Sequence, residues 1–375
     1  MKKTILVFNS INIKFIFFFR FLILLGFQIY YYSLSRDASS KDHQILKKNN
    51  INQIDLSRIK LINEKDWQNY QFGQNTNVNE ILEKKMSLKF VKNISNFYNL
   101  DWKKKEIYYL FSDLLSERVL NKSIRLKLFC ENFSEKVFFI SFDLSDIFTQ
   151  DDKFIKICLP FNFPIKIILK KWFSLIFSFK DKIVLKKKLV LTKNVNENFS
   201  SKKIIYIIHH GLNHANNRKT LIYDKEETSK NQISKDKILF FDYTNEKLFN
   251  KDIEVVKLND LNLNLKQFLK FNYDAIKILI SIRNIYDAGI FFHFIGYFFS
   301  SHKFYYFLKK YPKLKIAFYD YDFLTPKSLI FTTKLSGLIN MSYQERPMTV
   351  YSNHLSFCYD YYFFVSNFFL KKIEN

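Results

Sequence analysis

The chain has 375 residues, of which 48% are apolar and 25% charged, a balance typical of a folded globular protein and not of a disordered one. It carries a formal net charge of +24, and its 44 Phe and 23 Tyr stand beside only 6 Gly and 5 Pro. Because residues with A/T-rich codons are enriched together, much of this bias reflects nucleotide composition. The lysines are scattered, so the charge predicts a solvated basic surface, with a membrane-facing surface as the alternative and no nucleic-acid partner.

The first 34 residues predict a strand–helix–strand unit. Thr4–Phe8 has the composition of a short buried strand, Ile11–Leu25 that of a helix that is apolar nearly all round, and Gln28–Ser33 that of a second strand. Gly26 lies where a helix commonly ends in a left-handed residue. Because the crossover in such a unit makes its two strands parallel, the pattern predicts the start of a Rossmann-like sheet.

An N-terminal membrane anchor is the alternative interpretation of this stretch. Lys14 and Arg20 interrupt it, however, and leave no uncharged run of about 18 residues, the length needed to span a bilayer. We therefore expect residues 11–25 to form a helix that packs on a sheet.

The rest of the first half is predicted to be mainly helical. Residues 35–50 are polar and predict a loop or a disordered insert, whereas residues 51–133 have mostly helical patterns. The clearest helices in that range are Glu80–Phe97 and Trp102–Leu120, and Lys136–Phe142 is a strand candidate.

A basic, aromatic segment and a polar linker follow. Pro164–Lys180 predicts one helix, either packed on the sheet with its lysine stems at the rim or lying on a membrane surface. Lys193–Lys202 has little apolar content and is the best linker candidate. The sequence thus predicts a first region at 1–192, a linker at 193–202 and a Rossmann-like α/β half at 203–375.

The second half alternates strands and helices. Helices are predicted from Tyr273 to about Lys310 and at Pro326–Ser336. Strands are predicted at Lys203–Ile208, Ile238–Tyr243, Ile253–Leu258, Leu314–Tyr319, Leu338–Ser342 and Tyr361–Ser366. This alternation predicts an α/β fold with a mostly parallel sheet and flanking helices.

Several kinds of site are excluded by composition. Closely spaced glycines are lacking, which excludes a glycine-rich phosphate loop and a dinucleotide fingerprint. Cys130, Cys158 and Cys358 are odd in number and far apart, so they predict neither a disulfide framework nor a metal site, and buried thiols in a reducing compartment fit best. No cofactor and no bound metal are predicted.

Ligands of open α/β sheets bind beyond the carboxyl ends of the strands, so polar residues at those positions are the candidates. The first group, after the strand that ends at Ile208, comprises His209, His210, Asn213 and His214. Crowded histidines suit proton transfer or phosphate contact near neutral pH. The alternative is that they cap a helix or bond the loop backbone.

A second group follows the strand that ends at Tyr319. Asp320 and Asp322 alternate with aromatic residues, and their carboxylates could bind a hydroxylated group, a cationic group or a divalent metal. The alternative is that Asp322 caps the helix that begins near Pro326.

The third group, Gln344, Glu345 and Arg346, follows the strand that ends at Ser342. It combines an acid/base with a planar group that binds anions, and arginine is rare in this lysine-rich chain. A surface ion pair is the alternative. Because the carboxyl ends of parallel strands meet at one edge, we expect all three groups to line one cleft.

The order of elements in the second half resembles a known family. A strand, Asp320–Pro326, a helix ending at Gly337, a strand, Gln344–Pro347 and then Asp360 before a last strand are similar to the acceptor-side half of glycosyltransferase-like proteins of bacterial surface-polysaccharide synthesis. These proteins have the GT-B fold of two facing Rossmann-like domains. The opening strand–helix–strand unit, with Leu24–Phe27 before its second strand, is also similar to the start of many GT-B enzymes.

The resemblance covers roughly residues 1–35 and 203–370. Gln344–Arg346 occupies the place of a Gln-led motif that faces the interdomain cleft, although the family's more familiar motif is Gln-His-Gly. A GT-B enzyme continues with a domain that binds the nucleotide-sugar, and only Asn367–Asn375 follow here. Either that donor domain is missing, which is the preferred expectation, or residues 1–190 and 203–375 are themselves the two lobes.

The resemblance implies transfer of a sugar from a nucleotide-sugar to a glycan or lipid-linked acceptor. It places the protein in the cytoplasm, peripheral on the inner face of the membrane. His210 or Glu345 would be the catalytic base, and Arg346 would assist phosphate or acceptor binding. Two other classes stay open. One is a non-catalytic acceptor-lobe subunit that depends on a separate donor-domain partner, and the other is a basic, membrane-associated structural protein.

Overall fold

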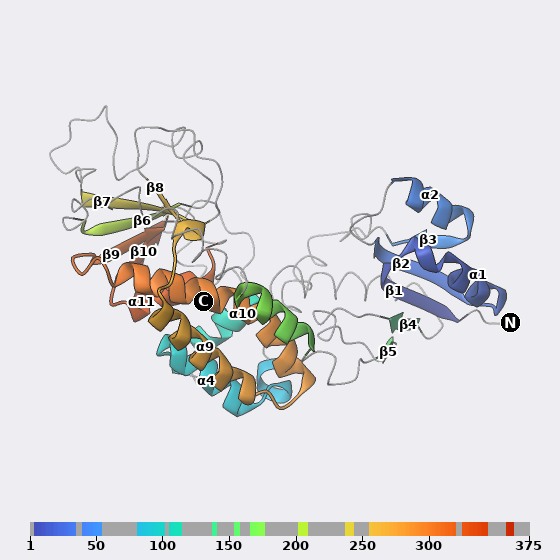
Figure 1. The fold of residues 1–375 in the computed structure, drawn as a ribbon, viewed down its shortest axis with the longest axis horizontal. Helices are drawn as coiled ribbons and strands as arrows, with labels where there is room; N and C mark the ends of the chain where they lie inside the picture. Colours follow the sequence, from blue (N-terminus) through green and yellow to red (C-terminus); the bar gives the residue numbers. More distant parts are fainter. Residues whose placement is uncertain are drawn as a thin grey trace. The chain divides into compact units, whose positions relative to one another are not determined.

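In the computed structural model, two compact units are distinguished by their internal contacts (Figure 1). The first consists of Met1–Met86, Leu115–Leu169 and Arg283–Phe292, and the second of Ser87–Leu114, Lys170–Ile282 and His293–Asn375. The residues that the structure describes are 4–34, 40–54, 81–101, 105–114, 137–140, 154–157, 166–176, 202–208, 237–243, 255–319, 325–343 and 358–363.

The first unit holds a five-stranded sheet in which every pairing is parallel. Its strands are β1 (Ile5–Ile11), β2 (Gln28–Leu34), β3 (Ile51–Gln53), β4 (Val137–Ile140) and β5 (Phe154–Ile157). They lie in the order β3-β2-β1-β4-β5. The chain therefore starts in the middle of the sheet, moves to one edge and returns to the other side of β1, as in doubly wound folds.

The predicted strand–helix–strand unit at the start of the chain is confirmed. A short turn of helix at Ile13–Phe15 leads into α1 (Ile16–Leu24), and the Asn12 side chain accepts a hydrogen bond from the backbone N–H of Lys14 at 2.9 Å. Gly26 ends the helix with a φ of 92°, a left-handed conformation that glycine adopts without a steric penalty. β1 and β2 are parallel partners, as predicted.

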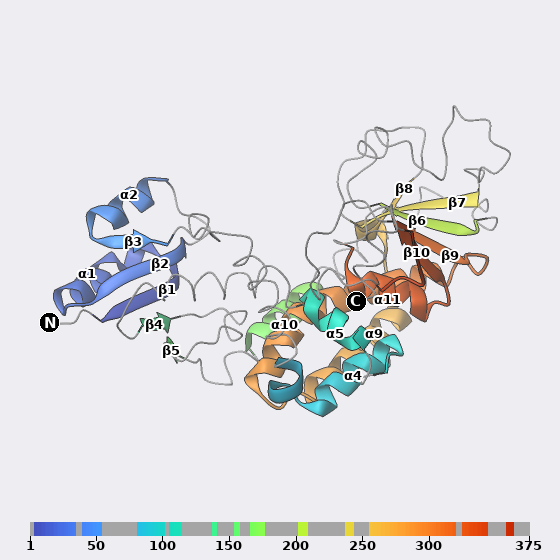
Figure 2. The same ribbon diagram turned by 180° about the vertical axis from the view of Figure 1, so that it is seen from behind.

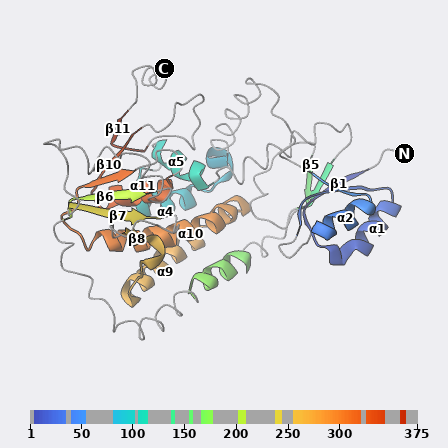
Figure 3. The same cartoon turned by 90° about the horizontal axis from the view of Figure 1, so that it is seen from above.

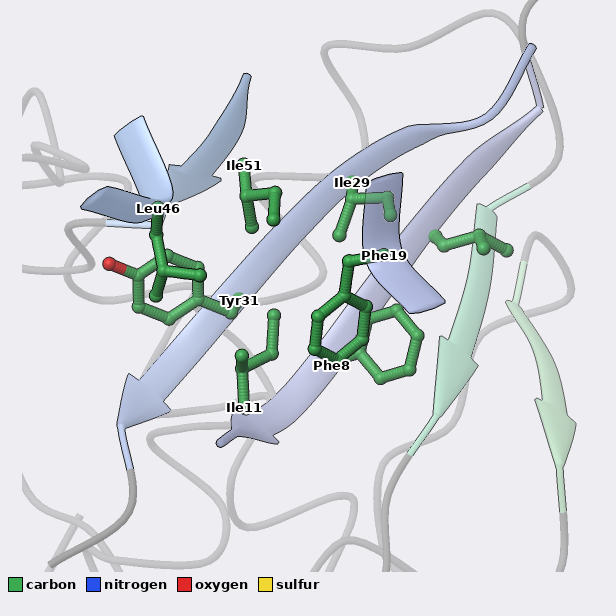
Figure 4. Packing of buried hydrophobic residues seen from close by; sticks show 8 residues of the cluster. Phe8, Ile11, Phe19, Ile29, Tyr31, Leu46 and Ile51 are labelled. Atoms are coloured by element: carbon green, nitrogen blue, oxygen red, sulfur yellow. The ribbon is translucent and has the colours of Figure 1, made fainter. Parts of the chain in front are cut away.

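The core of the first unit forms between the sheet and its helices (Figure 4). Phe19 of α1 packs edge-on against Phe8 of β1, with ring centroids 5.2 Å apart. Leu46 brings α2 (Ser40–Lys48) against the same cluster, and the Tyr31 hydroxyl lies 2.8 Å from Nδ1 of His43 on that helix. Full burial of such apolar side chains contributes about 1.5–3 kcal/mol each.

Two elements of the first unit differ from the sequence predictions. Residues 40–48 form α2, where a loop or a disordered insert was predicted, and residues 51–53 form β3 inside a range predicted to be helical. The reason is that Leu46 and Ile51 are fully buried, so contacts with the sheet stabilise segments whose own patterns are weak.

The second unit holds a six-stranded sheet that is also parallel throughout. The strands are β6 (Ile204–Ile208), β7 (Ile238–Asp242), β8 (Val255–Lys257), β9 (Ile316–Tyr319), β10 (Ile339–Tyr343) and β11 (Tyr361–Phe363). Their order is β11-β10-β9-β6-β7-β8. The predicted α/β fold, with Rossmann-like parallel sheets and flanking helices, is confirmed.

The described helices lie to one side of this second sheet (Figure 1). They include α4 (Leu88–Tyr98), α5 (Lys105–Leu114), α9 (Leu265–Ile280), α10 (Ile285–Leu308) and α11 (Lys327–Leu335). α11 contacts β10, and it also contacts α4 and α5 (Figure 2). Residues 166–176 form most of the helix predicted at Pro164–Lys180, and the Trp172 indole donates a hydrogen bond to Asn272 of α9 at 3.0 Å (Figure 3).

The range predicted to be helical, from Tyr273 to about Lys310, consists of the end of α9 and all of α10, with a break between them. α9 ends at Ile280, and α10 begins after Asn284, whose side chain accepts a hydrogen bond from the backbone N–H of Asp287 at 2.9 Å. The Asp287 carboxylate in turn accepts one from the backbone N–H of Arg283 at 2.9 Å. These reciprocal bonds satisfy backbone donors at the start of α10, so a new helix begins where the aromatic pattern looked continuous.

Candidate functional site

The strand order of the second sheet brings together the three strands that precede the predicted site groups. β6 lies beside β9, and β9 lies beside β10. Ile207 is the register partner of Tyr319, and Tyr319 is that of Ser342. Neighbouring strands are about 4.8 Å apart, so the chain leaves the sheet at three points that span about 10 Å at its carboxyl edge.

This edge is also the place where the strand order reverses. From β6 the chain proceeds outward to β7 and β8, and it then returns to the other side of β6 as β9. Such a topological switch point is where open α/β sheets bind their ligands. The first sheet has its own reversal, between β1 and β4.

The predicted site residues begin directly after these strand ends and lie outside the described residues. They are His209, His210, Asn213, His214, Asp320, Asp322, Gln344, Glu345 and Arg346. The strand order therefore supports their convergence at one edge, and the convergence of their side chains stays a prediction.

Asp242 is a buried carboxylate at the same edge that the sequence analysis did not single out. It is the last residue of β7, it is fully buried, and its register partner is Ile208, the residue before the histidine group. The signal in the sequence was a single acidic residue that ends an otherwise apolar strand, Ile-Leu-Phe-Phe-Asp. A carboxylate there can accept hydrogen bonds from hydroxyl or cationic groups of a ligand.

A buried hydrogen-bond network fixes the neighbouring strands β9 and β10 against α11. The Thr333 hydroxyl lies 2.6 Å from the Tyr319 hydroxyl and 2.6 Å from Oδ1 of Asn340. Because an amide oxygen only accepts, Thr333 donates to Asn340 and accepts from Tyr319. Burial raises the pKa of the Tyr319 hydroxyl, so this residue stays a neutral donor. The Ser342 hydroxyl adds a bond to the Tyr319 carbonyl at 3.1 Å.

A separate cavity of about 370 Å³ lies among helices of the second unit. α4, α9, α10 and α11 all contribute to its lining. Its polar lining residues are Asn93, Asn96, Lys270, Asp274, Lys277, His302, Tyr305 and Tyr306. No residue of this cavity was predicted from the sequence, because the group assembles from four helices and has no local motif.

Asp274 and His302 form the buried centre of this cavity. The Asp274 carboxylate accepts a hydrogen bond from Nζ of Lys270 at 2.7 Å, and its other oxygen lies 3.4 Å from Nε2 of His302. Nδ1 of His302 lies 3.0 Å from the Phe298 carbonyl and donates to it, since a carbonyl can only accept. Phe97 stacks on the imidazole with a centroid distance of 4.5 Å.

The charge of Asp274 is set by two opposing effects. Burial of the carboxylate would raise its pKa, but the hydrogen bonds and charges of His302 and Lys270 outweigh burial and hold the pKa of Asp274 below its ordinary value. Asp274 is thus ionised at neutral pH, and its charge is already balanced by these partners. The amide, hydroxyl and lysine groups around the pair suit a small anionic or hydroxylated ligand better than a cation.

The described residues carry neither of two features that would indicate a function directly. Within the described ranges, no group of three His, Cys, Asp or Glu side chains is placed to hold a metal ion. Of the helices in that part of the chain, none combines the length and the apolar character needed to cross a bilayer. Comparisons of the chain with protein-family models, with curated proteins and with solved structures gave no match.

Proposed function

We propose that the protein transfers a sugar from a nucleotide-sugar to a glycan or lipid-linked acceptor during surface-glycan synthesis at the inner face of the membrane. The observation that supports this proposal most is the strand order. Two separate parallel sheets each start in the middle and reverse direction once, as β3-β2-β1-β4-β5 and β8-β7-β6-β9-β10-β11. Two Rossmann-like sheets in one chain agree with the GT-B resemblance found in the sequence.

The sheet in the first half of the chain favours the expectation that residues 1–190 and 203–375 are themselves the two lobes. The described residues between 5 and 157 contain five parallel strands of their own, so the two halves of the chain can act as the two lobes. In this assignment the second sheet would bind the nucleotide-sugar, the role of the later lobe in a GT-B enzyme, and this departs from the resemblance of residues 203–370 to the acceptor-side half. The reversal between β6 and β9 is then the donor site.

The groups that follow β6, β9 and β10 have the chemistry that this donor site needs. Arg346 offers a planar pair of donors to a diphosphate, and His209 adds a further donor. His210 or Glu345 would accept the proton of the acceptor hydroxyl during transfer. Asp320 and Asp322, which follow β9 in the sequence, and the buried Asp242 at the end of β7 would bind sugar hydroxyl groups. Each role follows from position at the carboxyl edge of the sheet.

Isothermal titration calorimetry of the full chain with a panel of nucleotide-sugars tests this proposal. One donor should bind, and Arg346→Ala should weaken it by about 10-fold to 100-fold, the cost of losing a hydrogen bond to a charged group. Lys310→Ala is the matched control, because it removes an exposed cation after α10 and should leave the affinity unchanged.

The outcomes separate the alternatives. Binding that survives in Arg346→Ala and His209→Ala would show that the donor site is elsewhere. Failure of the folded chain to bind any donor would favour the partner-dependent subunit. Where binding occurs, Glu345→Gln or His210→Asn should abolish transfer while the donor affinity stays near that of the unchanged chain.

A further inference from the structure

Helix α1 packs on its sheet through only one side. Phe19 is buried in the core (Figure 4). Ile16, Leu22 and Ile23 are partly buried and pack against the same core. The sequence analysis expected a helix that is apolar nearly all round and packs on a sheet. The structure instead leaves large apolar side chains of this helix exposed to solvent.

The exposed side chains form one continuous apolar face, which we name the α1 outer face. It consists of Phe17, Phe18, Phe21, Leu24 and Leu25. Phe17 is 76% exposed and Leu24 85% exposed. Their spacing of one, four, seven and eight positions places them on one side of the helix, and Phe15 in the preceding turn is exposed beside them. Folded proteins rarely expose a contiguous apolar patch larger than a few hundred Å² unless it binds something.

Positive charge borders the α1 outer face. Lys14 and Arg20 are both exposed on the same segment, and Nε of Arg20 donates a hydrogen bond to the side chain of Asn49. The first 36 residues contain no Asp or Glu at all. The segment therefore combines aromatic and aliphatic side chains with an exclusively basic rim.

We propose that the α1 outer face docks on the surface of an anionic lipid bilayer. The nine residues of α1 span about 14 Å, too short to cross the hydrocarbon core, so the helix would lie in the plane of the interface. Its Phe and Leu side chains enter the acyl boundary, while Lys14 and Arg20 meet the lipid phosphates. This inference stands on the exposed face alone and does not depend on sugar transfer.

Charge complementarity selects the bilayer over other occupants. A second copy of the chain would bring two exclusively basic rims together, which opposes pairing through this face. The face offers no hydrogen-bonding side chain that would orient a protein partner, whereas a fluid apolar layer with anionic headgroups requires none. The exposed apolar residues of α9 are a weaker candidate, because the carboxylate of Asp274 lies on that helix.

Vesicle co-sedimentation of the full chain tests the proposal. The protein should bind vesicles that contain phosphatidylglycerol more tightly than vesicles of phosphatidylcholine alone, and added salt should weaken this binding. The triple variant Phe17→Gln, Phe21→Gln, Leu24→Gln should lose at least about tenfold in binding, because affinity scales with the apolar area inserted. Since these side chains are exposed, the thermal unfolding of the variant should stay close to that of the unchanged chain.

The matched control is the triple variant Leu265→Gln, Leu269→Gln, Ile280→Gln on α9, whose side chains are exposed to a similar degree. It should bind vesicles like the unchanged chain. A second test, Lys14→Glu with Arg20→Glu, should weaken binding to anionic vesicles only. The proposal would be overturned if the unchanged chain bound no vesicles, if the α1 variant bound them as tightly as the unchanged chain, or if only the α9 variant lost vesicle binding. It would also be overturned if the unchanged chain were a dimer and the α1 variant a monomer.

Discussion

Asp274 and His302 form a contact between a partly buried carboxylate and a buried imidazole in a polar cavity inside an aromatic helix layer. Both ring nitrogens of His302 face acceptors, the Phe298 carbonyl and the Asp274 carboxylate, so the ring can donate to both only when both nitrogens carry protons. Phe271 and Phe298 meet the ring edge-on, with centroids 5.3 Å and 4.5 Å away. Removing one partner of such a group costs more than the hydrogen bond itself contributes.

The lowered pKa of Asp274 predicts the pH dependence of stability. Between the folded pKa and the ordinary value of 3.8, the unfolded chain binds more protons, so the free energy of unfolding rises with pH there. The contribution of ionised Asp274 to the free energy of unfolding is fully present above the ordinary pKa of a carboxyl group. It is lost as the pH falls through the lower pKa that Asp274 has in the folded chain. Asp274→Asn should remove this acid-sensitive part and cost about 1–3 kcal/mol at neutral pH.

Urea unfolding followed by tryptophan fluorescence across this acid range measures the difference. Asp260→Asn is the control, since Asp260 is an exposed carboxylate next to α9, and it should retain the acid sensitivity of the unchanged chain. An Asp274→Asn variant that loses stability with acid as steeply as the unchanged chain would contradict the assignment.

Sequence reasoning reached only part of the candidate site at the residue scale. The strand-end rule selected the groups after Ile208, Tyr319 and Tyr343, and the strand order makes their strands neighbours. It overlooked Asp242, which ends its strand as a single acidic residue. It also missed the Asp274–His302 pair, because the two residues are 28 positions apart on different helices and meet only through tertiary packing.

At the scale of elements, the parallel strands were the most predictable part of the fold. β6 and β7 consist mainly of Ile, Leu, Phe and Tyr, as expected for strands buried on both faces. α2 was missed because most of its side chains are polar and its packing depends on Leu46. The strand β3 and the break between α9 and α10 depend on long-range packing and on capping side chains, which periodicity alone does not reveal.

The hydrogen bonds of Thr333 link α11 to β9 and β10, and we expect them to stabilise these strands beside the candidate site. Thr333→Val keeps the shape but removes the hydrogen-bond partner that the buried hydroxyl of Tyr319 and Oδ1 of Asn340 share, so it should lower the free energy of unfolding by about 1–3 kcal/mol. Thr332→Val is the matched control on the same helix. Its hydroxyl donates only to the Ser328 carbonyl, and its loss should cost less than about 1 kcal/mol. Chemical unfolding compares the two, and equal losses would mean that the network does not stabilise β9 and β10.

At the scale of the whole molecule, the two units share one plan. Each has a parallel sheet whose first strand lies in the interior and whose order reverses beside that strand. Strand order cannot be read from a single sequence, since the same alternation of strands and helices fits several orders. The observed order is what places the candidate donor site at β6 and β9, and it distinguishes that edge from the helical cavity around Asp274.

Hydrogen–deuterium exchange of the full chain, with and without the nucleotide-sugar that binds best, tests this central claim most directly. Donor binding at the switch point should slow exchange in peptides covering 209–214, 320–322 and 344–346, because a ligand bound there would shield their backbone amides from solvent. Peptides covering 93–97 and 270–278, which line the helical cavity, should be unchanged. Protection of the cavity peptides without protection after β6, β9 and β10 would contradict the account.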